Sequence, residues 1–344
     1  MNNQIPIGIV GLNFGRYILD ELQQEPASRH VTLAAVCDLD TAKAQQVATE
    51  RGVKAYADLD LLLKDPTIPA IGLFTSPVGR AGLIRKIVRA GKHVLTTKPF
   101  ELDPAAALDV LQEASRLGRV VHLNSPAPVL PADLAVIQRW RAQYDLGRPV
   151  GAHAETWMNY HEQADGRWYD DPRQCPVAPI FRLGIYMIND LVRLFGEAET
   201  VQVLQSRIRT GRPTADNAQL GIRFRNGVLA NIYASFCVGD GDYEPDSLVL
   251  KFENGTIYRN CGPTKPVART SVSLVMAREW KRQCVETVTL DTRSGGYQWS
   301  EFQRACRGEQ LPDAIQPEQI VAGLRIVTAM VEAERTNGIV GLST

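Results

Sequence analysis

The sequence carries no excess of charge of either sign. Its 344 residues include 38 lysines and arginines and 38 aspartates and glutamates, which gives a formal net charge of zero. Proteins that bind nucleic acid or anionic membranes by electrostatics concentrate lysine and arginine on one surface. The charge balance therefore predicts neither a nucleic-acid partner nor a membrane surface as partner.

Long apolar runs and a signal peptide are also missing. No apolar run approaches the roughly 18 residues that a membrane span needs. The N-terminus, MNNQIPIGIVGLNFGR, has no basic region followed by a small-residue cleavage site. The 6 cysteines are scattered without C-x-x-C spacing, which favours reduced thiols and no metal site. We therefore expect a cytoplasmic protein without a bound metal.

The first third of the chain alternates short apolar runs with helical patterns. This alternation is typical of a parallel, doubly wound sheet with helices on its faces. Ser76 and Pro77 have the residue types of a helix N-cap and first helical position, and Asp103-Pro104 precedes a second such helix. Strands are expected at 5–10, 31–38, 69–76, 92–97 and 119–124, within a first domain that covers residues 1–124.

After Pro126 the pattern changes. Alternating apolar residues flank Asn226-Gly227 and Asn254-Gly255, which predicts two antiparallel hairpins with type I′ turns. Helical patterns occupy 131–144, 181–195 and 317–335. We expect residues 125–344 to form a second, α+β domain with an open, largely antiparallel sheet. The helix at 317–335 has room to pack on either domain.

A glycine-bearing turn joins the first strand to the first helix in GIVGLNFGRYI. Such a turn lets backbone N–H groups face a pyrophosphate. The dinucleotide pattern G-x-G-x-x-G is incomplete, because Gly11 fits it while Asn13 and Arg16 occupy the other glycine positions. Asp38 ends the second strand, where a carboxylate binds the adenosine ribose and repels a 2′-phosphate. This favours NAD over NADP. Alternatively, Asp38 caps a helix at 40–52.

Two longer motifs carry a family resemblance. AGKHVLTTKPF resembles the aGkhVl-EKP motif of the Gfo/Idh/MocA oxidoreductases, with Thr97 in place of the glutamate. FRLGIYMINDLVRLFGE resembles their D-x-G-x-H helix in its tyrosine variant. This family includes glucose-fructose oxidoreductase and inositol dehydrogenase. The resemblance implies an N-terminal Rossmann-type domain followed by an α+β domain, and an NAD(P)-dependent dehydrogenase or reductase.

The resemblance also implies which residues surround the reacting carbon. Carried over residue by residue, they are Lys98, Arg182 and Tyr186, with Arg182 standing where the family has an aspartate. The resemblance further implies that the Lys98-Pro99 peptide bond is cis. The alternative for Lys98 is a solvent-exposed lysine beside a turn proline.

Tyr186 is the candidate proton acceptor. Nearby cations favour a phenolate, and residues 182 and 186 share one face of a helix. Tyr186 could instead be a packed amphipathic residue of this helix. Arg182 either pairs with a carboxylate such as Asp190 or acts as a fork for an anionic group of the substrate.

The stretch 155–172 is rich in aromatic and polar residues. Trp157 and His161 are candidates for the wall of a carbohydrate-binding pocket, because sugar faces stack on aromatic rings. The same aromatic residues could equally form core under a long loop or an oligomer contact. His161 is also the reserve candidate for proton transfer, and Asn189 completes the set of candidate substrate-binding residues.

We therefore expect an NAD-dependent enzyme that acts on a small polyhydroxylated, acidic sugar-like substrate, with Lys98 and Tyr186 at the reacting carbon. The alternative is a non-catalytic dinucleotide-sensing or regulatory protein that keeps the fold. A homo-oligomer, dimer or tetramer, is expected to form through the C-terminal sheet. The candidate cofactor-binding residues are Gly11, Asn13, Phe14, Gly15, Asp38, Thr75, Ser76, Pro77, Lys98 and Asn124.

Overall fold

The structure is a computed structural model that describes residues 4–241, 246–262, 269–291 and 295–342. Two compact units make up the chain. The first comprises Met1–Val129 and Gly296–Pro317, and the second comprises Leu130–Gly295 and Glu318–Thr344. This division differs from a single boundary at residue 124, because the segment 296–317 returns to the first unit.

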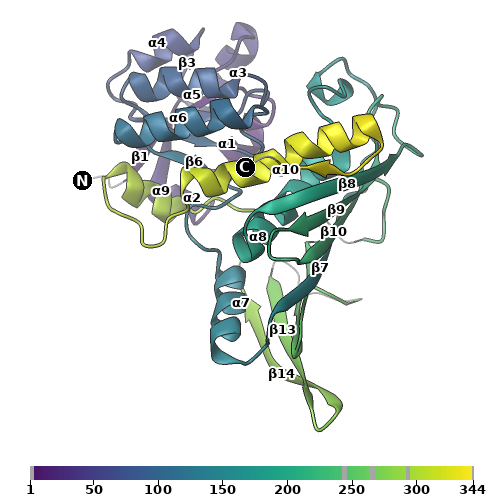
Figure 1. Cartoon of the computed structure of the whole chain (residues 1–344). Helices are drawn as coiled ribbons and strands as arrows, with labels where there is room; N and C mark the ends of the chain where they lie inside the picture. Colours follow the sequence, from purple (N-terminus) through teal and green to yellow (C-terminus); the bar gives the residue numbers. More distant parts are fainter. Residues whose placement is uncertain (1–3, 242–245, 263–268, 292–294, 343–344) are drawn as a thin grey trace. The chain divides into compact units, whose positions relative to one another are not determined.

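The first unit contains a six-stranded parallel sheet (Figure 1). Its order confirms the predicted doubly wound parallel sheet, with the change of winding direction between β1 and β4. The short strand β3 was not predicted, because its sequence KAY has no apolar run. The strands, in spatial order, are β3 (Lys54–Tyr56), β2 (Val31–Cys37), β1 (Ile5–Val10), β4 (Ala70–Leu73), β5 (His93–Thr96) and β6 (Val121–Leu123).

Helix starts in this unit follow local capping chemistry. The side chain of Asp103 accepts hydrogen bonds from the backbone N–H groups of Ala105 and Ala106, which confirms the expected N-cap. The expected start at Ser76-Pro77 was wrong, because the helix begins at Arg80 after Gly79, whose φ is 66°. The helices are α1 (Gly15–Glu21), α2 (Ala27–His30), α3 (Thr41–Arg51), α4 (Leu59–Leu63), α5 (Arg80–Arg89), α6 (Pro104–Arg116) and α9 (Trp299–Cys306).

Helix α9 belongs to the first unit because it completes that unit's core. Trp299 and Phe302 are buried in one apolar cluster with Ile7 and Ile9 of β1 and Val47 of α3. The Nε1–H group of Trp299 also donates to Glu21 of α1 at 3.1 Å. A segment far along the chain thus covers the sheet that carries the glycine turn.

The second unit is built on a nine-stranded sheet in which all adjacent strands run antiparallel except β7 and β10. This confirms the expected, largely antiparallel sheet. The strands, in spatial order, are β14 (Lys281–Leu290), β13 (Thr270–Arg278), β12 (Gly255–Arg259), β11 (Ser247–Phe252), β7 (Pro149–Trp157), β10 (Leu229–Ser235), β9 (Asn217–Phe224), β8 (Ala198–Ser206) and β15 (Val340–Gly341).

Both predicted hairpins form, but their turns are not of type I′. That type requires positive φ at both central residues. In the β9–β10 turn only Gly227 has a positive φ, 88°, and its N–H donates to the carbonyl of Phe224 at 2.9 Å. The turn is therefore type I followed by a left-handed glycine. Asn254 and Gly255 of the β11–β12 turn also lack positive φ.

Three helices accompany this sheet: α7 (Ala132–Gln143), α8 (Ile185–Phe195) and α10 (Pro317–Thr336). A π-helical turn, Ile180–Gly184, leads directly into α8. Helix α7 lies beside β13 (Figure 1). Helix α10 falls in the second unit and passes close to α8, because a Cβ added at Gly323 would lie 2.2 Å from Oδ1 of Asn189.

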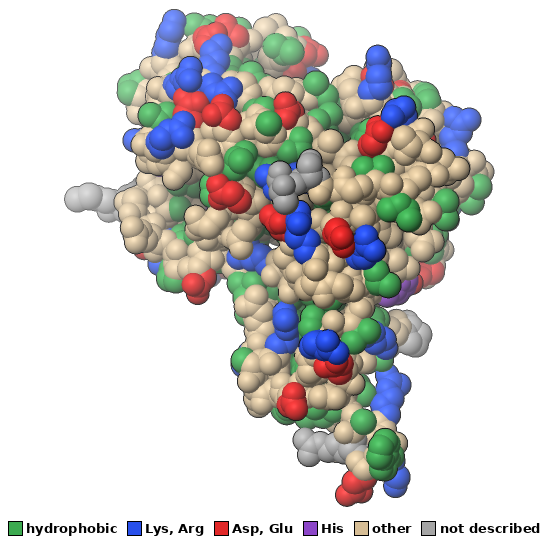
Figure 2. Space-filling model, in the orientation of Figure 1, with side chains coloured by type: hydrophobic (Ala, Val, Ile, Leu, Met, Phe, Trp, Pro, Cys, Tyr) green, Lys and Arg blue, Asp and Glu red, His purple; other side chains and the backbone are tan. Residues whose placement is uncertain are grey.

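The surface agrees with the charge balance of the sequence. On the face drawn in Figure 2, lysine and arginine side chains are interspersed with aspartate and glutamate side chains, and neither sign gathers into a large patch. In the parts of the chain that the structure describes, no helix is both long and apolar enough to cross a membrane.

Candidate active site

The turn after β1 brings three strand ends together in the first unit. Gly11 has a φ of 87°, and a Cβ at this position would lie 2.8 Å from the carbonyl oxygen of Phe74, which follows β4. Its N–H donates to the carbonyl of Cys37 at the end of β2. Only glycine fits this close approach. The turn lies at the carboxyl edge of the sheet, where open α/β sheets bind ligands.

Asp38 is held by this turn. One of its carboxylate oxygens accepts the Leu12 N–H at 2.7 Å, and the other accepts the Asp40 N–H at 3.0 Å. Burial would raise the pKa of Asp38, but these bonds and the Lys43 ammonium together hold it below its usual value. The alternative role as helix cap was wrong, because Asp40 caps α3 by accepting the Lys43 N–H.

The other cofactor candidates of this unit lie on the same edge. Asn13 and Phe14 are exposed in the glycine turn, and Gly15 is buried where α1 begins. Thr75, Ser76 and Pro77 follow β4, and Arg80 joins their loop to the loop after β5. The buried guanidinium of Arg80 donates to the carbonyls of Thr75, Thr97 and Pro99. Sequence reasoning missed Arg80, because an arginine in an amphipathic helix is most often a surface residue.

Lys98 follows β5 and is half-buried. Its backbone N–H donates to Oδ1 of Asn124 at 3.2 Å, and the same oxygen accepts the Thr97 hydroxyl at 3.3 Å. The Lys98-Pro99 peptide bond is cis, as expected. Asn124 at the end of β6 therefore positions the backbone that carries Lys98.

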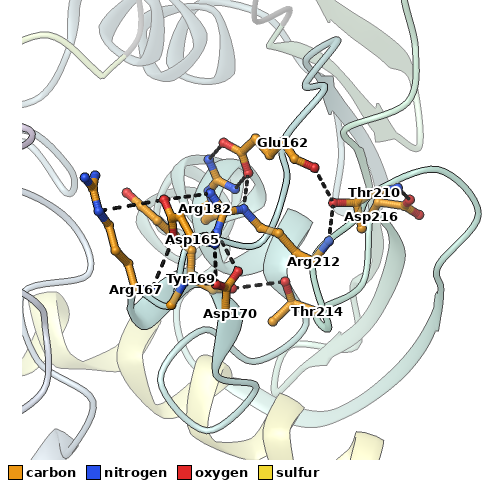
Figure 3. Close-up of polar contacts among 11 residues, drawn as sticks. Glu162, Asp165, Arg167, Tyr169, Asp170, Arg182, Thr210, Arg212, Thr214 and Asp216 are labelled. Carbon is orange, nitrogen blue, oxygen red and sulfur yellow. Dashed lines mark hydrogen bonds and ion pairs between the residues drawn. The ribbon is translucent and has the colours of Figure 1, made fainter.

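Arg182 in the second unit has a protein partner. Its two terminal nitrogens donate to the two carboxylate oxygens of Glu162 at 2.7 and 2.8 Å (Figure 3). The guanidinium carbon also lies 4.8, 4.4 and 4.7 Å from the ring centroids of Tyr160, Tyr169 and Phe236. The expectation that Arg182 holds an anionic substrate is therefore corrected, because Glu162 already occupies its planar fork.

Glu162 and Arg212 extend this pair into a network. Arg212 donates to Glu162 at 3.0 Å and to Asp165 and Asp170 at 3.1 and 2.5 Å (Figure 3). Burial would raise the pKa of Glu162, but the two arginines hold it below its usual value. The network ties the loop after β7 to the loop between β8 and β9. Sequence reasoning missed it, although an arginine at a buried position signals an acidic partner.

Tyr186 begins the first turn of α8 and is half-buried. A Cβ at Gly295, whose φ is 79°, would lie 2.5 Å from Cε1 of the Tyr186 ring. Glycine is therefore required where the chain passes this ring. The alternative for Arg182, pairing with a carboxylate of the protein, is confirmed with Glu162 as the partner. The partner is not Asp190, which pairs with Arg259 at 2.6 Å.

The remaining candidates of the second unit each have a contact of their own. Asn189 is buried against Gly323 of α10. Trp157, at the end of β7, donates from its indole N–H to Asp240 at 3.2 Å. His161 is exposed and contacts the guanidinium of Arg209. In the described ranges, no cluster of histidine, cysteine, aspartate or glutamate is arranged to hold a metal ion.

Comparison with known proteins identifies the family. Residues 5–125 match the GFO/IDH/MocA oxidoreductase family with its NAD-binding Rossmann fold, and residues 135–258 match the GFO/IDH/MocA C-terminal domain. The chain belongs to the GFO/IDH/MocA family.

Several of its curated relatives are named dehydrogenases or reductases. The chain is 25% identical over 235 residues to the inositol 2-dehydrogenase/D-chiro-inositol 3-dehydrogenase of Lactiplantibacillus plantarum, covering 65% of this chain and 64% of that protein. It is 29% identical over 203 residues to the UDP-N-acetylglucosamine 3-dehydrogenase of Acidithiobacillus ferrooxidans, covering 59% of each. The matched regions thus span about three fifths of these relatives.

A solved structure is similar over nearly the full length. The WlbA dehydrogenase from Bordetella pertussis, in complex with NADH and UDP-GlcNAcA, superposes with a TM-score of 0.71 and 16% identity, covering 99% of both chains. At this identity, the likeness shows the fold alone.

Proposed function

We propose that this chain is an NAD(H)-dependent oxidoreductase that transfers a hydride between the nicotinamide and a carbon of a small polyhydroxylated substrate. The observation that carries the proposal is the meeting of Gly11, Asp38 and β4 at the carboxyl edge of the parallel sheet. A turn without room for a side chain and a carboxylate oriented by that turn fit a dinucleotide with an unsubstituted adenosine ribose.

The residues that would hold the cofactor follow from this placement. Gly11, Asn13, Phe14 and Gly15 would face the pyrophosphate, and Asp38 would accept the ribose hydroxyls. Thr75, Ser76 and Pro77 would contact the cofactor along the same edge of the sheet. Lys98 and Asn124 would flank the nicotinamide. The family's NAD-binding fold supports this assignment, and it favours NAD over NADP through Asp38.

Lys98 and Tyr186 are the proposed catalytic residues. With NAD(H) bound at this edge, the cofactor would supply hydride transfer to or from the substrate carbon. Tyr186, as a phenolate, would accept the hydroxyl proton when an alcohol becomes a carbonyl, and would return it in the reverse reaction. Lys98 would donate a hydrogen bond to the reacting oxygen. Arg182 would add little positive potential at Tyr186, because Glu162 neutralises the charge of its guanidinium.

The proposed substrate is a neutral or anionic sugar or cyclitol. The names of two relatives, which act on inositol and on UDP-N-acetylglucosamine, support this class. Trp157 and His161 lie where the chain leaves β7 and are proposed to contact the substrate. Asn189, which lies close to Gly323 of α10, is proposed to complete the set of substrate-binding residues.

We also propose a cytoplasmic homo-oligomer that forms through the open face of the nine-stranded sheet. From His153 to Trp157 of β7 and from Ala230 to Ala234 of β10, buried and half-buried positions alternate, so that His153, Glu155 and Tyr233 remain partly accessible. Among the described residues no disulfide joins the cysteines, which supports a reducing compartment. Sedimentation velocity with Tyr233→Arg measures the assembly, and an unchanged oligomer would exclude this face.

The activity is tested by following NADH absorbance with a panel of inositols, hexoses, uronic acids and UDP-amino sugars. We expect turnover of at least one compound with NAD, and its loss in Lys98→Ala. NADH binding is measured separately from the fluorescence of the bound nicotinamide. Tight NADH binding without turnover of any compound would favour the alternative, a dinucleotide-sensing protein.

A further inference from the structure

A buried arginine at the start of α5 contacts the backbone on both sides of Lys98. Arg80 is 2% exposed. Its Nη1 group donates to the carbonyl oxygen of Thr97 at 2.8 Å and to that of Pro99 at 3.1 Å. One guanidinium therefore holds the residues before and after the proposed catalytic lysine, within a stretch that we call the lysine segment (residues 97–101).

The same guanidinium also contacts the end of the neighbouring strand, β4. Its Nη2 group donates to the carbonyl of Thr75. Its Nη1 group donates to the hydroxyl of Thr96 at 3.3 Å, and that hydroxyl donates in turn to the carbonyl of Leu73 at 2.7 Å. A planar guanidinium can serve several acceptors at once because it carries five N–H donors. Arg80 therefore joins the ends of β4 and β5.

Glu101 attaches the other end of the lysine segment to the same helix. Its side chain is buried, because the residue is 4% exposed, and its Oε2 accepts the backbone N–H of Ala81 at 2.8 Å. Two consecutive residues of α5 thus donate hydrogen bonds to the lysine segment, at Thr97 before Lys98 and at Glu101 after it. The start of α5 therefore fixes the course of the backbone that carries Lys98.

We propose that Arg80 and Glu101 are positioning residues, which fix the backbone of the lysine segment and so hold the Lys98 ammonium at the reacting oxygen. The proposal rests on the function proposed above, in which Lys98 contacts that oxygen. A lysine has a long and flexible stem, so the position of its ammonium is defined only when its backbone is fixed. A displacement of about 1 Å in a reacting group can lower the rate by a factor of about 100.

A purely structural role for Arg80 predicts a different result. The glycine turn (residues 11–15) has hydrogen bonds of its own, since the Gly11 N–H donates to the carbonyl of Cys37 and the Leu12 N–H donates to Asp38. Loss of the Arg80 contacts should therefore disturb the lysine segment while the glycine turn keeps its structure. If Arg80 only supported the fold, both regions would loosen together.

Hydrogen exchange of the full-length protein, followed by mass spectrometry of its peptides, measures the two regions separately. The variant is Arg80→Met, which keeps a long side chain and removes its donors. We expect the amides of the lysine segment to exchange about tenfold faster or more, and those of the glycine turn to change by less than about threefold. The matched control is Arg85→Met on the same helix, which breaks a pair with Glu113 of α6 and should leave both regions unchanged.

Kinetics measure the consequence for turnover. The value of kcat is expressed per NADH-binding site from calorimetry, so that unfolded protein does not enter it. In Arg80→Met, kcat should fall by about tenfold or more, and NADH affinity should change by less than about threefold. Arg80→Lys keeps a donor for the Thr97 carbonyl but loses the fork that also reaches Thr75, so its kcat should be intermediate. Glu101→Gln keeps an acceptor for the Ala81 N–H and should retain kcat within about threefold.

Three results would overturn the proposal. The first is equal acceleration of exchange in the lysine segment and the glycine turn. The second is loss of NADH binding in both Arg80→Met and Arg80→Lys, which would show that Arg80 supports the fold as a whole. The third is an unchanged kcat in Arg80→Met. An unmodified protein that turns over no substrate would instead overturn the proposed function, and hydrogen exchange would still decide whether Arg80 fixes the lysine segment.

Discussion

Arg182 and Glu162 form a bidentate ion pair with nitrogen–oxygen distances of 2.7 and 2.8 Å. The side chains are 13% and 25% exposed, and three aromatic rings surround the guanidinium. A buried arginine needs an acidic partner, and here the protein supplies it. Arg182 thus holds the loop that carries Tyr160 and Glu162, and an anionic group of the substrate is not needed to balance its charge.

Glu162→Gln should destabilise the protein. The change leaves Arg182 and Arg212 without the carboxylate that both contact, so we expect a loss of roughly 2–4 kcal/mol in the free energy of unfolding. Urea denaturation followed by tryptophan fluorescence measures this. The control is Glu199→Gln, which breaks an exposed pair with Arg223 and should cost less than about 1 kcal/mol. Similar losses in the two variants would contradict a supporting role for the pair.

Lys98→Ala should abolish turnover while the protein still binds NADH. Loss of a group that contacts the reacting oxygen is expected to lower kcat by a factor of about 100 or more, which is about 2.7 kcal/mol. NADH affinity should fall by less than about threefold, because backbone contacts and Asp38 dominate cofactor binding. Lys64→Ala, on the surface after α4, is the control. Retention of more than a tenth of the rate would show that Lys98 is not catalytic.

The sequence predicted the parallel sheet because its strands are continuous apolar runs, as in Ala70–Leu73, which is buried along its whole length. It also located Asp38 and Lys98, since both directly follow such runs. The start of α5 was predicted at Ser76-Pro77 but lies after Gly79, because both sequences are suitable for a helix start. The contacts of Arg80 with the carbonyls of Thr75, Thr97 and Pro99 favour the later start, and these are tertiary contacts.

The partner of Arg182 could not be read from the sequence. The segment between residues 162 and 182 has no periodic sequence pattern that would predict a contact between them. Asp190, on the same predicted helix as Arg182, was an equally suitable acidic partner. The fold places Asp190 on Arg259 and brings Glu162 to Arg182. Pairings between segments distant in sequence depend on tertiary structure, whereas strand ends and caps depend on local patterns.

Gly295→Ala should impair catalysis through Tyr186. The added methyl group would lie 2.5 Å from the Tyr186 ring, and the φ of 79° is unfavourable for alanine. The ring must move, so we expect kcat to fall by about tenfold or more, with NADH affinity unchanged. Gly308→Ala is the matched control, because it has a similar φ of 80° and open space around the added methyl group. An equal fall in kcat in both variants would attribute the effect to backbone strain.

The stability of the protein should depend on pH through Asp190. Burial raises the pKa of Asp190 to about 6, although the Arg259 guanidinium opposes this. In the unfolded chain the pKa of an aspartate is about 3.9, so the folded state binds the proton more tightly. This contribution to stability is fully present below about pH 4 and is lost as the pH rises through about 6.

Over that range the slope from Asp190 alone is at most about 1.4 kcal/mol per pH unit. Urea denaturation at pH 4.5, 5.5, 6.5 and 7.5 measures it for the unmodified protein and for Asp190→Asn, which cannot lose a proton. The free energy of unfolding of the unmodified protein minus that of the variant should decrease from pH 4.5 to 6.5 and then level off. A difference that stays constant with pH would show that Asp190 remains ionised beside Arg259 throughout this range.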